Sequence, residues 1–298
     1  MSTERNPQNK DVIFLVGAQR TGSNYLLSAL KSVDDISVYG ELFHRNGPYP
    51  FKENTESDET WRWRVLSHFF ETRSHLLSNL KLQTPGEIAA LLEKHSSGAP
   101  LTNPAHTSLR NKTLSQIAHQ MPFAYISSIR EISECRTIIF KAFPEHLNTS
   151  ELHNLIKSLR PIIVYNLRNT LDMFVSYQKL KKTKLPQGED TTSIKVRFAI
   201  QDYVQFLVET RSFFFAVRDF SNYFGLEQHT ISYEDIHIHQ TDSEKVRFIS
   251  DQLAHWTGRN WHVNESRIKT FRRQDQSKSN ADKVLNSEEL PMQPATIF

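Results

Sequence analysis

The chain of 298 residues has one cysteine, only nine glycines and no long hydrophobic run. The single cysteine, Cys135, excludes an internal disulfide and a cysteine-rich zinc site, and we interpret it as a buried structural thiol in a reducing compartment. No segment approaches the roughly 18 apolar residues of a membrane span, and the polar start MSTERNPQNK lacks the apolar core of a signal peptide. We therefore expect a cytoplasmic protein without a transmembrane segment.

The chain also lacks a strong excess of charge. Its 36 basic and 33 acidic residues leave a formal net charge of +3, too little to indicate a nucleic-acid-binding protein. Hydrophobic residues make up 38% and charged residues 23%, as in an ordinary globular chain. We expect one domain over 1–298, because this length buries a sizeable core and demands no second domain.

Short apolar runs alternate with helical patterns along most of the sequence. Such alternation is typical of βαβ units, so it predicts an α/β fold with a central, mostly parallel sheet flanked by helices. The expected strands are 12–16, 36–39, 137–140, 161–166 and 230–233. The expected helices lie near 26–30, 152–159, 171–178, 195–222 and 244–256.

The segment from about 45 to 130 departs from this alternation. It is polar, contains helical periods such as WRWRVLSHFFETR and EIAALLEKH, and carries loop signals at TPG and SSGAPLTNP. We interpret it as a mainly helical insertion that shapes a substrate cleft. A purely structural cap is the alternative.

The stretch IFLVGAQRTGSNYLLSAL runs from an apolar strand through a loop containing Gly17 and Gly22 into a helical pattern. A strand, a glycine loop and a helix start aim several backbone N–H groups one way, with the positive end of a helix dipole behind them. The stretch is therefore a candidate anion cradle, with phosphate as the first candidate ligand. It lacks the Gly-Lys-Ser/Thr ending of a nucleoside-triphosphate P-loop, and Arg20 stands near the place of that lysine.

A second candidate anion site follows the strand at 161–166. Arg168 comes directly after that strand, and Ser176 lies eight residues further on, within the next helix. Ligands gather at the carboxyl ends of strands in open α/β sheets, and an arginine there offers bidentate hydrogen bonds to phosphate. Alone, this pair is weak evidence.

Together, AQRTGSNYLLSAL and RNTLDMFVSYQK resemble the paired signatures of sulfotransferases that use 3′-phosphoadenosine 5′-phosphosulfate (PAPS). In that family the first loop grips the 5′-phosphosulfate, and the arginine and serine of the second motif hold the 3′-phosphate. SYEDI at 232–236 and NSEE at 286–289 resemble later elements of the family. The loop from Gln19 to Ser23 is closer to the carbohydrate-type (bacterial and Golgi-like) branch than to the phenol and steroid branch, which implies a P-loop-like fold and a sugar hydroxyl as acceptor.

The resemblance also implies the residues of the nucleotide site. Sulfuryl transfer in line between two oxygens is catalysed mostly by positioning and charge stabilisation, so no metal is expected. Helix N-capping is the alternative role for Ser23 and Asn24. The expected nucleotide contacts are Arg20, Thr21, Gly22, Ser23, Asn24, Arg168, Ser176, Arg272 and Arg273.

The acceptor hydroxyl needs a general base. The family resemblance places a catalytic carboxylate at Glu41 in YGELFH, and His44 is the rival, because histidine titrates near neutral pH. A purely structural Glu41, paired with an arginine, is the third possibility. Lys141 in IIFKAF is a candidate contact to the sulfuryl group or the substrate, with a solvated lysine as its alternative. A metal site is not expected at the widely and irregularly spaced histidines His68, His75, His95, His106 and His119.

Two other functions are kept open. A nucleotide kinase or other P-loop NTPase would use Mg²⁺, but the missing Gly-Lys-Ser/Thr counts against it. A protein that binds PAPS or its desulfated product PAP without turnover would keep the cradle and have no need of Glu41. The sequence identifies neither the acceptor nor the oligomeric state.

Overall fold

The structure is a computed structural model that describes residues 11–49, 57–79, 85–96, 104–133, 135–183, 190–270 and 279–298. Five strands form one sheet in the order β2-β3-β1-β4-β5. Both β2 with β3 and β4 with β5 pair in parallel, which confirms the expected α/β class with a parallel central sheet. The strands are β1 (Asp11–Val16), β2 (Ile36–Glu41), β3 (Thr137–Ala142), β4 (Ile162–Leu167) and β5 (Gln228–Ser232).

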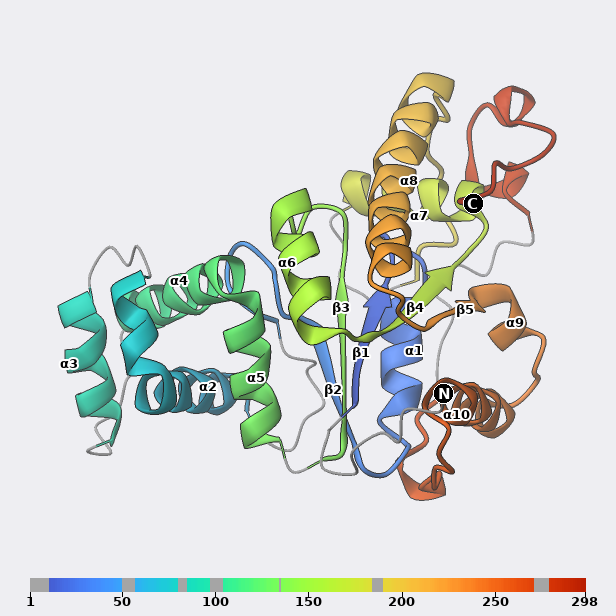
Figure 1. The fold of residues 1–298 in the computed structure, drawn as a ribbon. Helices are drawn as coiled ribbons and strands as arrows, with labels where there is room; N and C mark the ends of the chain where they lie inside the picture. Colours follow the sequence, from blue (N-terminus) through green and yellow to red (C-terminus); the bar gives the residue numbers. More distant parts are fainter. Residues whose placement is uncertain are drawn as a thin grey trace. The chain divides into compact units, whose positions relative to one another are not determined.

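Helices connect these strands, and those between β2 and β3 form the expected helical insertion (Figure 1). The insertion contains α2 (Asp58–Arg73), α3 (Pro85–Ser96), α4 (Pro104–Gln120) and α5 (Pro122–Ile132), with a 3-10 turn at Ser74–Asn79. The other helices are α1 (Ser23–Leu30), α6 (Thr149–Leu159), α7 (Thr170–Thr183), α8 (Ile200–Tyr223), α9 (Tyr233–His237) and α10 (Asp242–Thr257).

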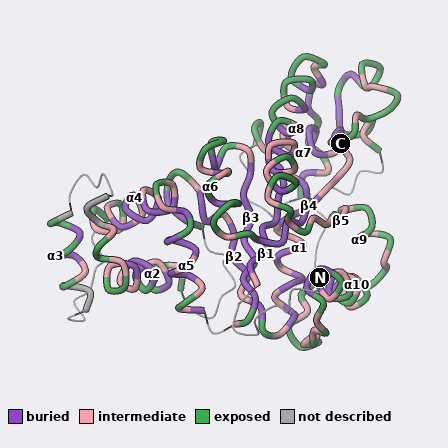
Figure 2. Tube along the Cα trace, in the orientation of Figure 1, coloured by how far each residue is buried: buried purple, intermediate pink, exposed green. Residues whose placement is uncertain are grey.

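The chain divides into two compact units, which are described separately. The first unit comprises 1–14 and 35–161. All six residues of β3 are buried, and since successive side chains of a strand point to opposite faces, both faces of β3 are covered. Within the insertion, α5 packs against α2 and α4, and it also contacts α6 (Figure 1). The buried tube segments of Figure 2 follow the strands and the inner sides of these helices.

The second unit comprises 15–34 and 162–298. In it α1 packs against α10 and α7 against α8, and five of the six residues of β4 are buried. An aromatic cluster of Phe174, Phe198 and Tyr203 fills the space beside α7. The side chain of Asn286 holds this region to the C-terminal segment, because it accepts a hydrogen bond from the backbone N–H of Phe198 and donates one to its carbonyl, both at 2.8 Å.

Three expectations about local structure need correction. Cys135 is only half-buried, so it is not a core thiol. The long helix expected from residue 195 begins at Ile200, because Val196 is extended and bridges Val284. Strand β5 ends at Ser232, whose hydroxyl accepts a hydrogen bond from the backbone of Asp235 and so starts α9 at Tyr233. Among the described residues, no helix is long and apolar enough to cross a membrane.

Candidate active site

The loop between β1 and α1 has the backbone shape of an anion cradle. Gly22 is the N-cap of α1 with φ 85° and ψ 13°, and Arg20 also has a positive φ of 71°. Left-handed backbone costs a residue that carries a Cβ about 1–2 kcal/mol, so Arg20 is held under strain. Thr21, fully buried between them, donates its hydroxyl to the carbonyl of Ala18 and accepts from Asn166 at 3.1 Å. These bonds tie the loop to the end of β4.

The first and second motifs meet within the second unit. The guanidinium Nε of Arg20 donates to the hydroxyl of Ser176 at 2.9 Å, although the two residues are 156 positions apart. Arg168 Nη1 donates to the carbonyl of Arg20, also at 2.9 Å. The structure therefore brings together three residues that the sequence assigned to two separate motifs.

The third motif, SYEDI, contributes to the same place. The carboxylate of Glu234 accepts a hydrogen bond from the backbone N–H of Asn169 at 2.9 Å. The ring of Tyr233 lies 4.2 Å from the guanidinium carbon of Arg168 and stacks on His237 at 3.7 Å. This ring also closes over Gly22, where an added Cβ would lie 2.5 Å from its Cδ2 atom. Sequence reasoning gave no role to Tyr233.

The electrostatics of this cluster suit an anion. Burial, and secondly the positive charge of Arg168, lower the pKa of Arg20. Within the described part of the chain, the Nε–H of Arg168 is buried without a hydrogen-bond partner. A buried donor without a partner and two guanidinium groups in proximity both carry a free-energy cost. An anion bound between them would reduce both costs.

Not every expected nucleotide contact has this geometry. The N-capping role considered for Ser23 and Asn24 is wrong, because Gly22 is the N-cap and no side chain caps the helix. Ser23 and Asn24 are instead the first two residues of α1, at the positive end of its helix dipole. Arg272 and Arg273 lie outside the described residues.

In the first unit, a β-bulge sets the position of Glu41. Val38 pairs with Ile139 and Glu41 with Lys141, so β2 carries one more residue than β3 over this interval. An extra residue re-aims the side chain that follows it. Glu41 therefore stands directly across from Lys141, with its Oε1 at 3.3 Å from Lys141 Nζ. Lys141 is 2% exposed, so the alternative of a solvated lysine is wrong.

Beside this pair lies His146, which the sequence analysis did not single out. Its Nε2 is 3.7 Å from Glu41 Oε2, and its Nδ1 accepts a hydrogen bond from the backbone N–H of Phe143 at 3.2 Å. The side chain is 1% exposed. Its only sequence signal is its place in the turn that follows β3, five residues after Lys141.

His44 lies in the turn after Glu41 and has a similar bond. Its Nδ1 accepts a hydrogen bond from the backbone N–H of Asn46 at 3.2 Å. Its ring meets Tyr49 edge-on at 4.6 Å and His146 at 5.7 Å. In a neutral imidazole whose Nδ1 accepts a hydrogen bond, the proton is on Nε2.

The helical insertion holds the turn that carries His44. Arg45, the next residue, contacts both α4 and α6. Its carbonyl accepts a hydrogen bond from the hydroxyl of Ser115, and its Nη2 is 3.5 Å from Glu151 Oε2. Glu151 Oε1 is also 3.2 Å from Nδ1 of His119 in α4. Glu151 belongs to the capping box of α6 with Asn148, which fixes its carboxylate at the helix start.

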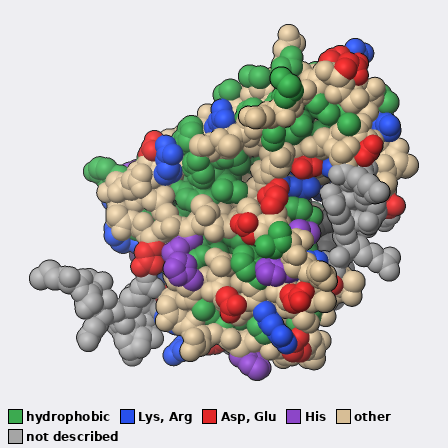
Figure 3. Space-filling view, turned by 90° about the vertical axis from the view of Figure 1, so that its right-hand side faces the viewer, with side chains coloured by type: hydrophobic (Ala, Val, Ile, Leu, Met, Phe, Trp, Pro, Cys, Tyr) green, Lys and Arg blue, Asp and Glu red, His purple; other side chains and the backbone are tan. Residues whose placement is uncertain are grey.

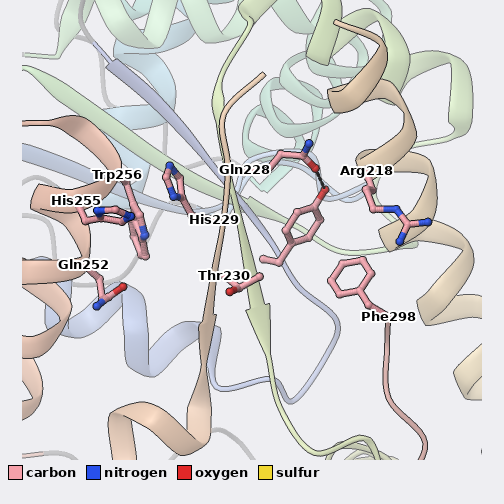
Figure 4. A pocket seen from close by; sticks show the side chains of 9 residues that line it. Arg218, Gln228, His229, Thr230, Gln252, His255, Trp256 and Phe298 are labelled. Carbon is pink, nitrogen blue, oxygen red and sulfur yellow. Dashed lines mark hydrogen bonds between the residues drawn. The ribbon is translucent and has the colours of Figure 1, made fainter. Parts of the chain in front are cut away.

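A separate pocket of about 520 Å³ lies along β5 in the second unit. Figure 4 shows Gln252, His255 and Trp256 on one side of the strand and Arg218 and Phe298 on the other. Tyr165 donates to Gln228 at 2.9 Å within it. Its walls share no residue with the anion cradle and contain no glycine loop, so we do not assign the nucleotide to it.

The described surface in Figure 3 carries acidic and basic side chains intermixed with histidines. On that face there is no field of one sign to attract a polyanion. Among the described residues, no three His, Cys, Asp or Glu side chains are grouped so that they could hold a metal ion.

Comparison with known proteins gives likenesses to solved structures only. No family model and no curated protein matches the chain. A solved structure similar to it is the sulfotransferase domain from the Synechococcus PCC 7002 olefin synthase, at 13% sequence identity and a TM-score of 0.44. The match covers 98% of this chain and 93% of that chain. A likeness of this degree carries no conclusion about activity or substrate.

Proposed function

We propose that this protein is a sulfotransferase that transfers a sulfuryl group from PAPS to a hydroxyl of a carbohydrate or glycolipid. The observation that carries the proposal is the convergence of Arg20, Arg168 and Ser176. These are the residues to which the two family-like motifs assign phosphate binding. A cytoplasmic location belongs to the proposal and is supported by the scarcity of cysteine.

The cradle has the donors that a phosphosulfate and a 3′-phosphate require. Arg20 and the backbone N–H groups at the start of α1 would neutralise the 5′-phosphate and the sulfuryl oxygens. Arg168, with its partnerless Nε–H, and Ser176 would bind the 3′-phosphate. Transfer in line then depends on fixed positive charge where negative charge develops.

Glu41 is the general base in this proposal. The hydrogen bonds to Nδ1 of His44 and of His146 support this choice, because a neutral imidazole with its proton on Nε2 offers no free lone pair to an acceptor hydroxyl. A carboxylate oxygen has two lone pairs, so Glu41 can contact Lys141 and still accept a proton. Glu41 is 26% exposed, which leaves it open to a substrate.

Lys141 has two roles in the proposal. It balances the charge of Glu41, and it would approach the sulfuryl group or the acceptor as charge develops in the transition state. Burial lowers the pKa of Lys141, while the charge of Glu41 acts in the opposite direction. Its ammonium group also lies 4.6 Å from the ring of Phe143.

Two alternatives remain in view. A P-loop kinase or NTPase would need Mg²⁺ and normally a P-loop lysine, whereas this loop has Arg20 in a left-handed conformation. A binding protein without turnover would release no PAP from PAPS. Its affinities for PAP and for PAPS would be the same in the Glu41→Gln variant as in the unsubstituted protein.

The first experiment is a calorimetric titration of the purified protein with PAP and with ADP, which lacks the 3′-phosphate. We expect PAP to bind at least about tenfold more tightly, since a charge-assisted hydrogen bond contributes about 1.5–3 kcal/mol. Arg168→Ala should remove most of that difference. Arg218→Ala, an arginine of the same unit in the pocket of Figure 4, is the matched control and should leave both affinities unchanged. Equal binding of PAP and ADP, or a requirement for Mg²⁺, would contradict the proposal.

A further inference from the structure

We infer that His146 is a positioning residue that orients the Glu41 carboxylate as a neutral hydrogen-bond donor. The inference rests on the proposed function, in which Glu41 accepts the proton of the attacking hydroxyl. It adds to that function a residue that neither the sequence motifs nor the family resemblance indicates.

The imidazole of His146 is held by one short turn. The backbone N–H of His146 donates to the carbonyl of Phe143 at 3.0 Å, and the backbone N–H of Phe143 donates to Nδ1 of His146 at 3.2 Å. These reciprocal bonds fix the ring against its own backbone. Because the Nδ1 lone pair is occupied, the neutral ring carries its proton on Nε2, the atom that faces Glu41.

The surroundings keep this ring neutral. It is almost fully buried, and the titratable groups around it are Glu41 in β2, together with His44, Lys141, His119 and Arg45 from the turn after β2, from β3 and from α4. Burial first, and then the neighbouring His44, Lys141, His119 and Arg45, lower the pKa of His146 to about 3. The contact with Glu41 is therefore that of a neutral N–H donor with a carboxylate, and not an ion pair.

Two different donors thus approach the two oxygens of Glu41. Lys141 Nζ is 3.3 Å from Oε1, and His146 Nε2 is 3.7 Å from Oε2. The second distance is too long for a direct hydrogen bond, so the inferred contact requires a small side-chain rotation or a bridging water. Once held at both oxygens in this way, the carboxylate would have a defined plane and would keep a lone pair on each oxygen for the acceptor hydroxyl.

A neutral donor suits this position better than a second cation. Each added positive charge beside a carboxylate stabilises its ionised form and weakens it as a base. An N–H donor without net charge orients the group with a smaller loss of basicity. His146, whose tautomer the turn fixes, therefore orients the Glu41 carboxylate, whereas Lys141 balances its charge.

The test uses the full chain and measures hydrolysis of PAPS to PAP and sulfate, with water as the acceptor. In this reaction the bond between sulfur and the phosphate oxygen breaks, a bond between sulfur and the water oxygen forms, and Glu41 takes the proton from water. We expect His146→Leu to lower kcat about tenfold or more, because loss of orientation at a reacting group is costly. His146→Gln, whose amide keeps an N–H donor at this length, should recover most of it. PAP affinity should stay within twofold in both variants, since the cradle residues are untouched.

The matched control is His75→Leu, an exposed histidine of the same unit, which should leave kcat unchanged. Long-range ¹H–¹⁵N NMR of the unsubstituted protein should show His146 as the neutral Nε2–H form from pH 7 to pH 5, and this readout does not depend on any variant folding. An Nδ1–H or cationic ring, or full turnover in a folded His146→Leu, overturns the inference while the proposed function stands. An unsubstituted protein that neither binds PAP nor hydrolyses PAPS overturns both.

Discussion

Gly22 is the position at which the cradle should be least tolerant of a side chain. In Gly22→Ala the new methyl group meets two separate costs. The backbone there is left-handed, with φ +85°, and the added Cβ would lie 2.5 Å from Cδ2 and 3.1 Å from Cε2 of Tyr233. Contacts under about 3 Å must be relieved by movement, so Tyr233 has to retreat by roughly 1 Å.

The size of the effect follows from these two costs. The left-handed backbone costs alanine about 1–2 kcal/mol, and forcing an extra carbon into a packed place costs a further 1–3 kcal/mol, roughly. Retreat is hindered because the Tyr233 ring is stacked on His237 at 3.7 Å and lies against the guanidinium of Arg168. We therefore expect Gly22→Ala to lower the free energy of unfolding by about 2–5 kcal/mol, measured by urea denaturation at pH 7.

Gly258→Ala separates the two costs. Gly258 has a φ of +65° in the same unit, but a Cβ there meets nothing within 4 Å, so only the backbone cost applies. A second comparison, Gly22→Ala combined with Tyr233→Ala, should destabilise less than the sum of the two single changes, because the clash is then absent. The reasoning is refuted if Gly22→Ala is no more destabilising than Gly258→Ala, or if the double change is additive.

Three further predictions concern both units. Asn286→Ala should lower the free energy of unfolding by about 2–3 kcal/mol, because it removes the partners of the N–H and carbonyl of buried Phe198. A loss below about 0.5 kcal/mol would count against a stabilising role for these two hydrogen bonds. The pKa of His146 is 6.5 in the unfolded chain and about 3 in the folded chain, so the unfolded chain takes up the proton first as the pH falls. The free energy of unfolding should therefore fall by about 2 kcal/mol from pH 7 to pH 5. His146→Gln should lack that part of the pH dependence, and an identical slope in both proteins would be the contrary result. Arg20→Gly should change stability by less than about 1 kcal/mol, as relief of the left-handed strain offsets the lost bond to Ser176, yet weaken PAP binding about tenfold or more by calorimetry.

The order of strands and helices could be predicted from the sequence because apolar runs and helical periods are local signals. The run at 12–16 became β1, and the pattern at 152–159 became α6, whose start is fixed by the Asn148 and Glu151 capping box. The errors fall where a tertiary contact decides. Residues 195–199 have a helical composition, but the backbone of Val196 bonds to Lys283 and Leu285 and stays extended.

The residues of the candidate site likewise divide into those that the sequence indicates and those that only the tertiary structure indicates. Arg168 could be proposed because it follows an expected strand, where ligands gather in α/β folds, and the family resemblance assigned roles to Arg20 and Glu41. His146 could not, because its importance depends on a turn that aims its ring and on a tautomer fixed by one backbone N–H. Tyr233 was missed because an aromatic at the start of a short helix carries no signal until Gly22 lies beneath it.

The bulge in β2 makes the number of residues as important as their identity. Between Val38 and Glu41 the strand has one residue more than its partner, and regular pairing of the same residues would set Gly40 across from Lys141 and turn the carboxylate toward the opposite face. Any attempt to transplant this stretch of β2 onto another parallel sheet has to carry the irregular pairing with it, since the register, and not the glutamate alone, gives the group its direction.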